Sequence, residues 1–219
     1  MKFKAFLTVL ALLPLAAGAE EVKDVEYRQF IDAFHLKDFI DSKADITSVV
    51  RFQFGLQPEN QDMTWRDVSF AIDGVVYRPD RHWSLDLPIS GELYDRNPTV
   101  TRTSRLPGKF SIGMAVVVVG SFDKQVGATQ LGRAKAHYDD LMAHASFLVR
   151  NLAPEMVRVA VRGDDASGRC FIEGAENETQ AKPFGNAGEI VFDLKAATKP
   201  PAKGIACSSP ISAVLLSEG

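Results

Sequence analysis

Three residues with metal-binding or acid–base side chains lie at helical spacing in the segment 130–152. His137, Asp140 and His144 are three and four residues apart, so a helix places them on one face. Imidazoles and a carboxylate are ligands for zinc and other first-row metals. However, the helical rise separates the two histidines by about 10 Å along the axis, which is too far for one tetrahedral ion. We expect no bound metal, and interpret this polar cluster as the hydrated margin of a helix.

A second group, of aromatic and cationic residues, lies between positions 65 and 83. Sugars and peptides are often held on aromatic faces with a few polar groups beside them. Trp83 also belongs to an alternating apolar pattern, which favours a packing role for that ring. Arg96, Arg102 and Arg105 add positive charge downstream. The group predicts a ligand-binding surface made of Trp65, Tyr77, Arg78, Arg81, His82 and Trp83.

Motifs for covalent or phosphate chemistry are absent from the sequence. There is no G-x-S-x-G nucleophile elbow and no glycine-rich phosphate loop, so we predict neither a catalytic residue nor a cofactor. The paired carboxylates Asp139-Asp140 and Asp164-Asp165 fit a solvated helix face and a turn. We therefore favour a protein that is not an enzyme. A hydrolase or metal-dependent enzyme using residues of the 130–152 helix is the alternative.

The first nineteen residues resemble a secretory signal peptide. Lys2 and Lys4 precede an apolar run, and Ala17-Gly18-Ala19 supplies small residues before a cleavage site. The run is too short to span a bilayer, which takes about 20 residues, and no later segment is a transmembrane candidate. We predict cleavage after Ala19 and export to a bacterial periplasm.

Charge and cysteine content agree with an exported binding protein. The 25 basic residues include Lys2 and Lys4, so the mature chain has 23 against 28 acidic residues, a net charge of −5. That balance argues against a nucleic-acid partner. Cys170 and Cys207 are the only two cysteines, and an exported protein tends to pair them. The bond would close a loop of about 38 residues, and the loop-entropy model predicts that it stabilises the folded state by roughly 3–4 kcal/mol.

One long amphipathic helix is expected among β-type segments. Its apolar stripe ends before Pro154 and comprises Leu131, Ala134, Tyr138, Leu141, Ala145, Leu148 and Leu152. A shorter helix is predicted to open at Asp24, its N-cap, with an apolar stripe of Tyr27, Phe30, Ile31 and Phe34. Alternating residues predict strands at 46–56, 68–72, 75–77, 83–89, 110–119, 156–162, 170–172, 190–194, 205–207 and 211–216.

These elements predict a mainly β protein with two helices, of the α+β class. We expect antiparallel β-sandwich-like portions on either side of the long helix; a single α+β domain with an extended sheet is the alternative. The predicted organisation is a signal peptide over 1–19, a helix and β-rich portion over 20–129, a connecting helix over 130–153, and a disulfide-bonded β-rich portion over 154–219.

The segments Val49–Leu56, Leu87–Leu93 and Asn97–Val100 resemble those of small secreted proteobacterial proteins of unknown function. The resemblance implies a periplasmic location and no catalytic activity. Our hypothesis is a periplasmic, non-enzymatic protein that binds an envelope component or another protein. A further hypothesis is an assembly factor whose exposed strand edge, at Trp83–Ile89, pairs with a client chain.

Overall fold

The computed structural model describes residues 21–42, 48–165, 167–174, 182–183 and 188–218. The expected signal peptide, residues 1–19, lies outside these ranges. The chain forms two compact units, one from Met1–Lys43 and Gln53–Met114 and the other from Ala44–Phe52 and Ala115–Gly219. We call them unit 1 and unit 2. Strands β2 (Val50–Pro58) and β7 (Phe110–Val118) run through both.

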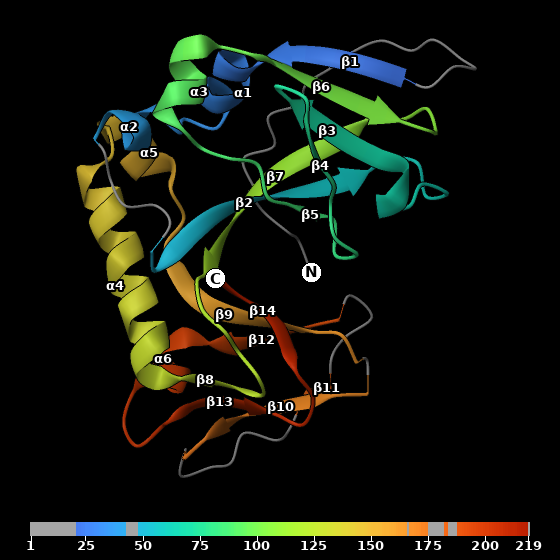
Figure 1. Cartoon of the computed structure of the whole chain (residues 1–219). Coiled ribbons are helices and arrows are strands. Elements are labelled where there is room, and N and C mark those ends of the chain that lie inside the picture. Colours follow the sequence, from blue (N-terminus) through green and yellow to red (C-terminus); the bar gives the residue numbers. More distant parts are fainter. Residues whose placement is uncertain (1–20, 43–47, 166, 175–181, 184–187, 219) are drawn as a thin grey trace. The chain divides into compact units, whose positions relative to one another are not determined.

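Unit 1 contains a four-stranded antiparallel sheet in the order β1-β6-β3-β4 (Figure 1). Strand β6 is central, and its inward residues Val100 and Ser104 are buried. The other elements of unit 1 are short and surround this sheet. The described elements are β1 (Glu21–Glu26), α1 (Tyr27–Ala33), α2 (Lys37–Asp41), η1 (Trp65–Asp67), β3 (Val68–Ile72), β4 (Val75–Tyr77), β5 (Ser84–Leu85), α3 (Gly91–Arg96) and β6 (Thr99–Ser104).

The hairpin between β3 and β4 follows directly from the sequence. Its two turn residues, Asp73 and Gly74, have φ angles of 49° and 78°, as a type I′ turn requires of both central positions. Glycine adopts positive φ without steric cost, and aspartate tolerates it better than most residues. Asp73 and Gly74 thus form the turn between the two strands predicted at 68–72 and 75–77.

Helix α1 carries the predicted aromatic stripe, but it begins later than expected. Asp24 is not its N-cap, because Asp24 lies in β1 and its carboxylate accepts a hydrogen bond from Thr101 of β6 at 2.7 Å. The rings of Phe30 and Phe34 pack against each other and against Phe54, at centroid distances of 4.8–5.3 Å. This aromatic cluster anchors α1 on β2.

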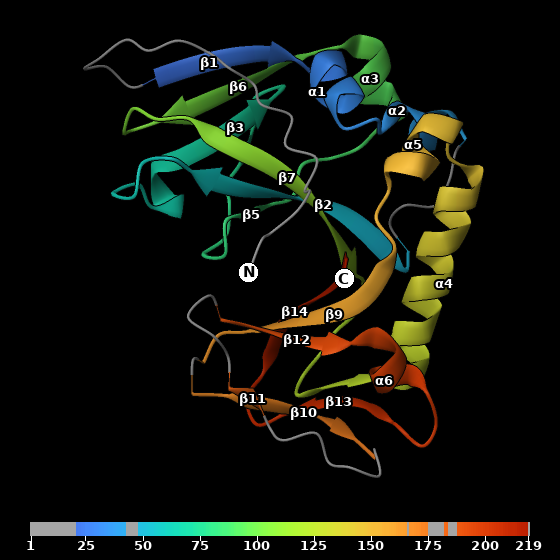
Figure 2. The ribbon, with the colours of Figure 1, turned by 180° about the vertical axis from the view of Figure 1, so that it is seen from behind.

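Unit 2 combines two sets of antiparallel strands with the remaining helices (Figure 2). One sheet has the order β11-β10-β13-β8, and the other places β12, β9 and β14 next to β7. The described elements are β8 (Gln125–Gly127), α4 (Ala128–His144), α5 (Phe147–Leu152), β9 (Met156–Gly163), β10 (Arg169–Glu173), β11 (Lys182–Pro183), β12 (Glu189–Asp193), α6 (Leu194–Thr198), β13 (Gly204–Cys207) and β14 (Ile211–Glu218).

The single long helix expected over 130–153 is not confirmed. Helix α4 ends at His144, the backbone is extended at Ala145, and α5 begins after Ser146. The hydroxyl of Ser146 accepts a hydrogen bond from the Val149 N–H, so serine acts as an N-cap and starts a second helix. The predicted apolar stripe is buried as far as Ala145. The side chains of Leu148 and Leu152 lie outside the described residues.

The predicted strand at Trp83–Ile89 is reduced to the two residues of β5. Ser84 and Leu85 are both buried, whereas an alternating strand would expose one of them. In contrast, the polar threonine-rich run at 99–104 forms the central strand β6, with its threonines on the outward face. The fold is therefore mostly antiparallel β-sheet with several helices, and the expected sandwich arrangement is not confirmed.

Candidate binding surface

Three exposed arginines emerge at one end of the unit-1 sheet. Arg66 lies in η1, two residues before β3 begins, Arg78 directly follows β4, and Arg105 directly follows β6. In an antiparallel sheet the start of β3 lies beside the ends of its two neighbours. The register agrees, since Val68 pairs with Ser104 and Phe70 with Tyr77. We call this set, with Trp65 and Tyr77, the arginine end.

Trp65 and Arg66 are held together in the short helix η1. The Arg66 guanidinium lies over the Trp65 ring, 4.7 Å from its centroid, at a distance typical of a cation–π contact. The turn is fixed by Asp67, whose carboxylate accepts hydrogen bonds from the Thr64 hydroxyl at 2.6 Å and the Thr64 N–H at 2.9 Å. These bonds hold the pKa of Asp67 below its ordinary value. The carboxylate is thus ionised and committed to the turn.

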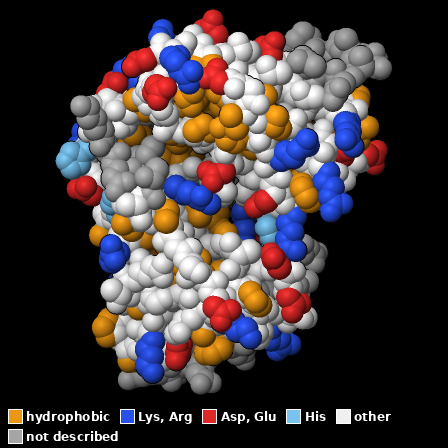
Figure 3. All heavy atoms as spheres, viewed as in Figure 1, with side chains coloured by type: hydrophobic (Ala, Val, Ile, Leu, Met, Phe, Trp, Pro, Cys, Tyr) orange, Lys and Arg blue, Asp and Glu red, His pale blue; other side chains and the backbone are white. Residues whose placement is uncertain are grey.

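The loop after β4 is closed by Asp80. Its carboxylate accepts hydrogen bonds from the N–H groups of His82 and Ser84, at 2.8 and 2.9 Å. In the same loop the Arg81 Nε donates to His82 Nε2 at 3.2 Å. The loop therefore carries a cationic and an imidazole side chain, three and four residues after Arg78. Figure 3 shows Lys and Arg side chains on the side of unit 1 where η1 and this loop lie.

Trp83 has a packing role as well as a place in this loop. Its φ is 60°, a left-handed conformation that is strained for a bulky side chain. Two backbone bonds hold it there: the Trp83 N–H donates to Asp80, and the Trp83 carbonyl accepts from Leu56 at 2.8 Å. The ring packs against Phe110 with a centroid distance of 6.0 Å. Only part of Trp83 is exposed.

The other two downstream arginines are directed elsewhere. Arg96 forms an ion pair with Asp73 at 2.7 Å, at the hairpin turn and so at the opposite end of β3 and β4. The Arg102 guanidinium lies over the Phe110 ring, 5.2 Å from its centroid. Of the three arginines that the sequence placed after the aromatic group, only Arg105 lies at the arginine end.

The polar cluster of α4 is spread along the helix surface. His144 Nδ1 lies 2.8 Å from the carbonyl oxygen of Asp140 and 3.7 Å from its carboxylate. This places His144 at the C-terminal turn, where an imidazole interacts favourably with unpaired carbonyls. Within the described part of the chain, no three His, Cys, Asp or Glu residues are grouped to hold a metal ion, His137 included.

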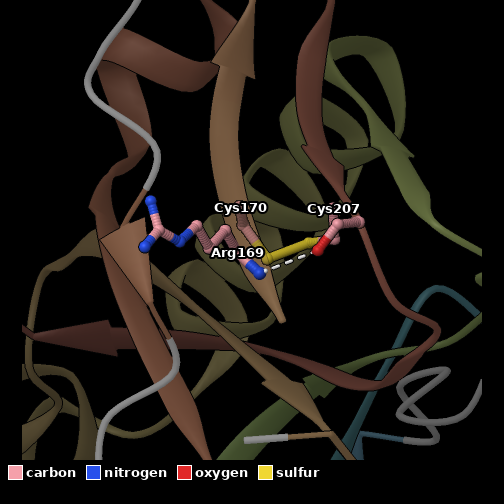
Figure 4. Close-up of a disulfide and its surroundings, with 4 residues drawn as sticks. Arg169, Cys170 and Cys207 are labelled. Carbon is pink, nitrogen blue, oxygen red and sulfur yellow. Dashed lines mark hydrogen bonds between the residues drawn. A yellow bond between two sulfur atoms is a disulfide. The ribbon is translucent and has the colours of Figure 1, made fainter. Parts of the chain in front are cut away.

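The disulfide between Cys170 and Cys207 is confirmed. The two residues are direct partners in the β10–β13 pair, and their side chains are buried. Figure 4 shows the bond between the two strands, next to a hydrogen bond of 3.0 Å from the Arg169 N–H to the Ser208 hydroxyl. The buried, cross-strand position indicates a structural bond.

Comparison with protein-family models, curated proteins and solved structures yields no match to this chain. Among the described helices, none has the length and apolar character needed to cross a membrane.

The sequence-predicted surface is partly brought together. Trp65, Tyr77 and Arg78 meet at one sheet end, and Arg81 and His82 follow in the adjoining loop. Arg66 was missed, because nothing local distinguishes it from a solvated arginine. Its position at the same sheet end as Arg105 depends on the β3–β6 register, which pairs residues that are far apart in the sequence.

Proposed function

We propose that this chain is a periplasmic, non-enzymatic β-sandwich-type protein that binds an anionic segment of an envelope component or of another protein. Binding takes place at the arginine end. The signal-like first nineteen residues and the buried disulfide support export to an oxidising compartment. Antiparallel sheets without a catalytic motif support a binding role.

The observation that carries the proposal is the convergence of Arg66, Arg78 and Arg105 at one sheet end. The two carboxylates in the same region, Asp67 and Asp80, are both used by backbone and hydroxyl hydrogen bonds of their own turns. These bonds leave both carboxylates charged, and the Asp67 carboxylate interacts electrostatically with Arg105. Three guanidinium groups against two carboxylates still give a net positive charge, beside two half-buried aromatic rings. Such a combination attracts an anionic partner and provides apolar contact area for it.

The test uses the mature protein, residues 20–219, and two fluorescent pools of short peptides, one rich in Glu and the other rich in Lys. We expect anisotropy to show binding of the acidic pool, weakening as salt is added. The Arg66→Glu/Arg78→Glu/Arg105→Glu variant should bind at least about tenfold more weakly.

A matched variant controls for net charge. Arg133→Glu/Arg158→Glu/Lys199→Glu changes three exposed residues of unit 2 and alters the total charge equally. It should bind the acidic pool as the wild type does. Equal binding by the two triple variants, or preference for the Lys-rich pool, would contradict the proposal.

A further inference from the structure

Strand β4 is an open edge of the unit-1 sheet. It is the last strand in the order β1-β6-β3-β4, and its residues Val75 and Val76 are each 54% exposed. No other large hydrophobic residue among those described is as exposed. Figure 3 shows hydrophobic side chains gathered on this face of unit 1, where β4 lies. Natural proteins usually cover or charge such an edge, because it pairs with other chains.

The hairpin geometry determines which backbone groups face outward. In a two-residue hairpin, the residues that flank the turn, Ile72 and Val75, are hydrogen-bonded to each other. The next pair, Ala71 and Val76, is then a non-hydrogen-bonded pair. The N–H and C=O of Val76 therefore point away from β3, toward the open edge.

Side-chain alternation relates this edge to the arginine end. Val76 and Arg78 are two residues apart, so they lie on the same face, and Val75 lies on the other. A chain that paired with β4 would place one residue beside Val76 and another, two positions along, beside Arg78. Its apolar residues would cover the two valines, and an acidic residue at the second position would meet the guanidinium.

We propose that β4 takes up an extended peptide segment of a partner protein as an additional strand. The segment has apolar residues opposite Val75 and Val76 and an acidic residue opposite Arg78. This inference rests on the proposed function and names the partner: an unfolded or extended acidic–apolar chain, bound by β-augmentation.

Charge complementarity favours such a peptide over a second copy of this chain. If two β4 strands paired antiparallel about Val76, Arg78 of each copy would face Gly74 of the other. The arginine end of each copy would then have no acidic partner. A peptide with apolar and acidic residues uses both the exposed valines and the arginines.

Two other sheet edges, β1 and β12, carry acidic side chains. Strand β1 presents exposed Asp24 and Glu26. Strand β12 has one exposed valine, Val191, between Glu189 and Asp193. Of these three edges, only β4 combines two exposed valines with an exposed arginine that follows them, so it suits an acidic–apolar segment best.

The probe is the end-blocked peptide Thr-Glu-Val-Val-Val-Glu-Thr, which reads the same in both directions and so fits either strand orientation. Binding to the mature protein is measured by calorimetry. Methylation of all three valine nitrogens removes the valine backbone donors that would face β4 in either strand orientation, and should weaken binding by about tenfold or more. Replacement of both glutamates by lysine should do the same.

The matched protein variants are Val76→Pro and Val76→Thr. Proline removes the outward N–H without removing a hydrogen bond to β3, and edge positions tolerate it; threonine retains the N–H. We expect loss of binding only with Val76→Pro. As a measurement that needs no variant, amide exchange at Val76 in the wild type should slow when the peptide is added.

The outcomes separate the two proposals. If Val76→Pro and the methylated peptide bind normally while Arg78→Glu does not, strand addition is wrong and anionic recognition stands. If none of these changes weakens binding, both the strand-addition proposal and the anionic-recognition proposal are wrong. Dimerisation of the wild type in sedimentation experiments, abolished by Val76→Pro, would assign the edge to a second copy and overturn the peptide proposal.

Discussion

Cys207 lies directly opposite Cys170 in the antiparallel β10–β13 pair, with 4.1 Å between their Cα atoms. The bond joins residues 37 positions apart and so restricts a long loop of the unfolded chain. We expect the Cys170→Ala/Cys207→Ala variant to lose about 2–4 kcal/mol of unfolding free energy. Chemical denaturation with and without reductant measures this. Reductant should lower the unfolding free energy of the wild type but leave that of the variant unchanged. Equal unfolding free energies of wild type and variant without reductant would show that the bond does not stabilise the fold.

The hydroxyl of Tyr27 joins two segments of unit 1. It donates to the Pro88 carbonyl at 2.7 Å and accepts from the Ser90 N–H at 3.1 Å, and the residue is fully buried. Tyr27→Phe leaves both groups without this partner, at a cost of about 1–3 kcal/mol. Tyr94→Phe is the control, because the Tyr94 hydroxyl bonds to Asp32 at the surface and should cost less than about 1 kcal/mol. Similar losses in both variants would contradict this account.

The sequence predicted which segments form helices and strands better than it predicted where these helices and strands begin and end. The Asp73-Gly74 turn was predictable because it depends on the backbone preferences of these two residues. The disulfide was predictable because the chain has only two cysteines. The break at Ala145–Ser146 was not, since the apolar stripe continues through it and only the serine cap marks it. Strand β6 was missed as a central strand because Thr99, Thr101 and Thr103 face outward and give no strong hydrophobic alternation.

The candidate surface was predictable only in part, for a different reason. Trp65, Tyr77 and Arg78 can be identified in the sequence as aromatic and cationic residues that often bind ligands. Their position at one sheet end, however, depends on strand register. The pairing of Val68 with Ser104 brings Arg66 and Arg105 to the same sheet end, with Asp67 opposite Arg105. Such long-range pairing cannot be derived from local patterns.

Tyr138 provides a prediction for alkaline pH. Burial, with the nearby charge of Asp139, raises its pKa to about 12. Since tyrosine in the unfolded chain ionises near pH 10, the unfolded state loses its proton first. The contribution of Tyr138 to stability is therefore complete below about pH 10 and falls as the pH rises toward 12.

Absorbance of tyrosinate and denaturation at several alkaline pH values test this. Tyr138→Phe should remove the latest ionisation step and flatten the decline in stability. Asp139→Asn should lower the pKa of Tyr138 slightly. Ionisation of Tyr138 near pH 10 in the folded protein would be inconsistent with its burial.

Gly204 marks a close approach between β13 and β8. Its φ is 128°, and a Cβ atom there would collide with the backbone carbonyl of Val126. We expect Gly204→Ala to cost about 2 kcal/mol or more. Gly132→Ala in α4 is the control: a Cβ there meets nothing within 4 Å, and alanine should stabilise the helix by about 0.5–1 kcal/mol. In thermal denaturation we expect Gly204→Ala to lower the melting temperature and Gly132→Ala to raise it. An unchanged melting temperature for Gly204→Ala would contradict the close approach of the two strands.

The most direct test of the central claim is to locate a bound acidic peptide on the protein. The glutamate–valine peptide, carrying a photoreactive group at one end, is irradiated with the mature chain, and the adducts are mapped by mass spectrometry. We predict adducts within residues 65–81 and at Arg105, and their loss in the Arg66→Glu/Arg78→Glu/Arg105→Glu variant. Adducts on α4 around His137 and His144, or adducts spread evenly over both units, would contradict binding at the arginine end.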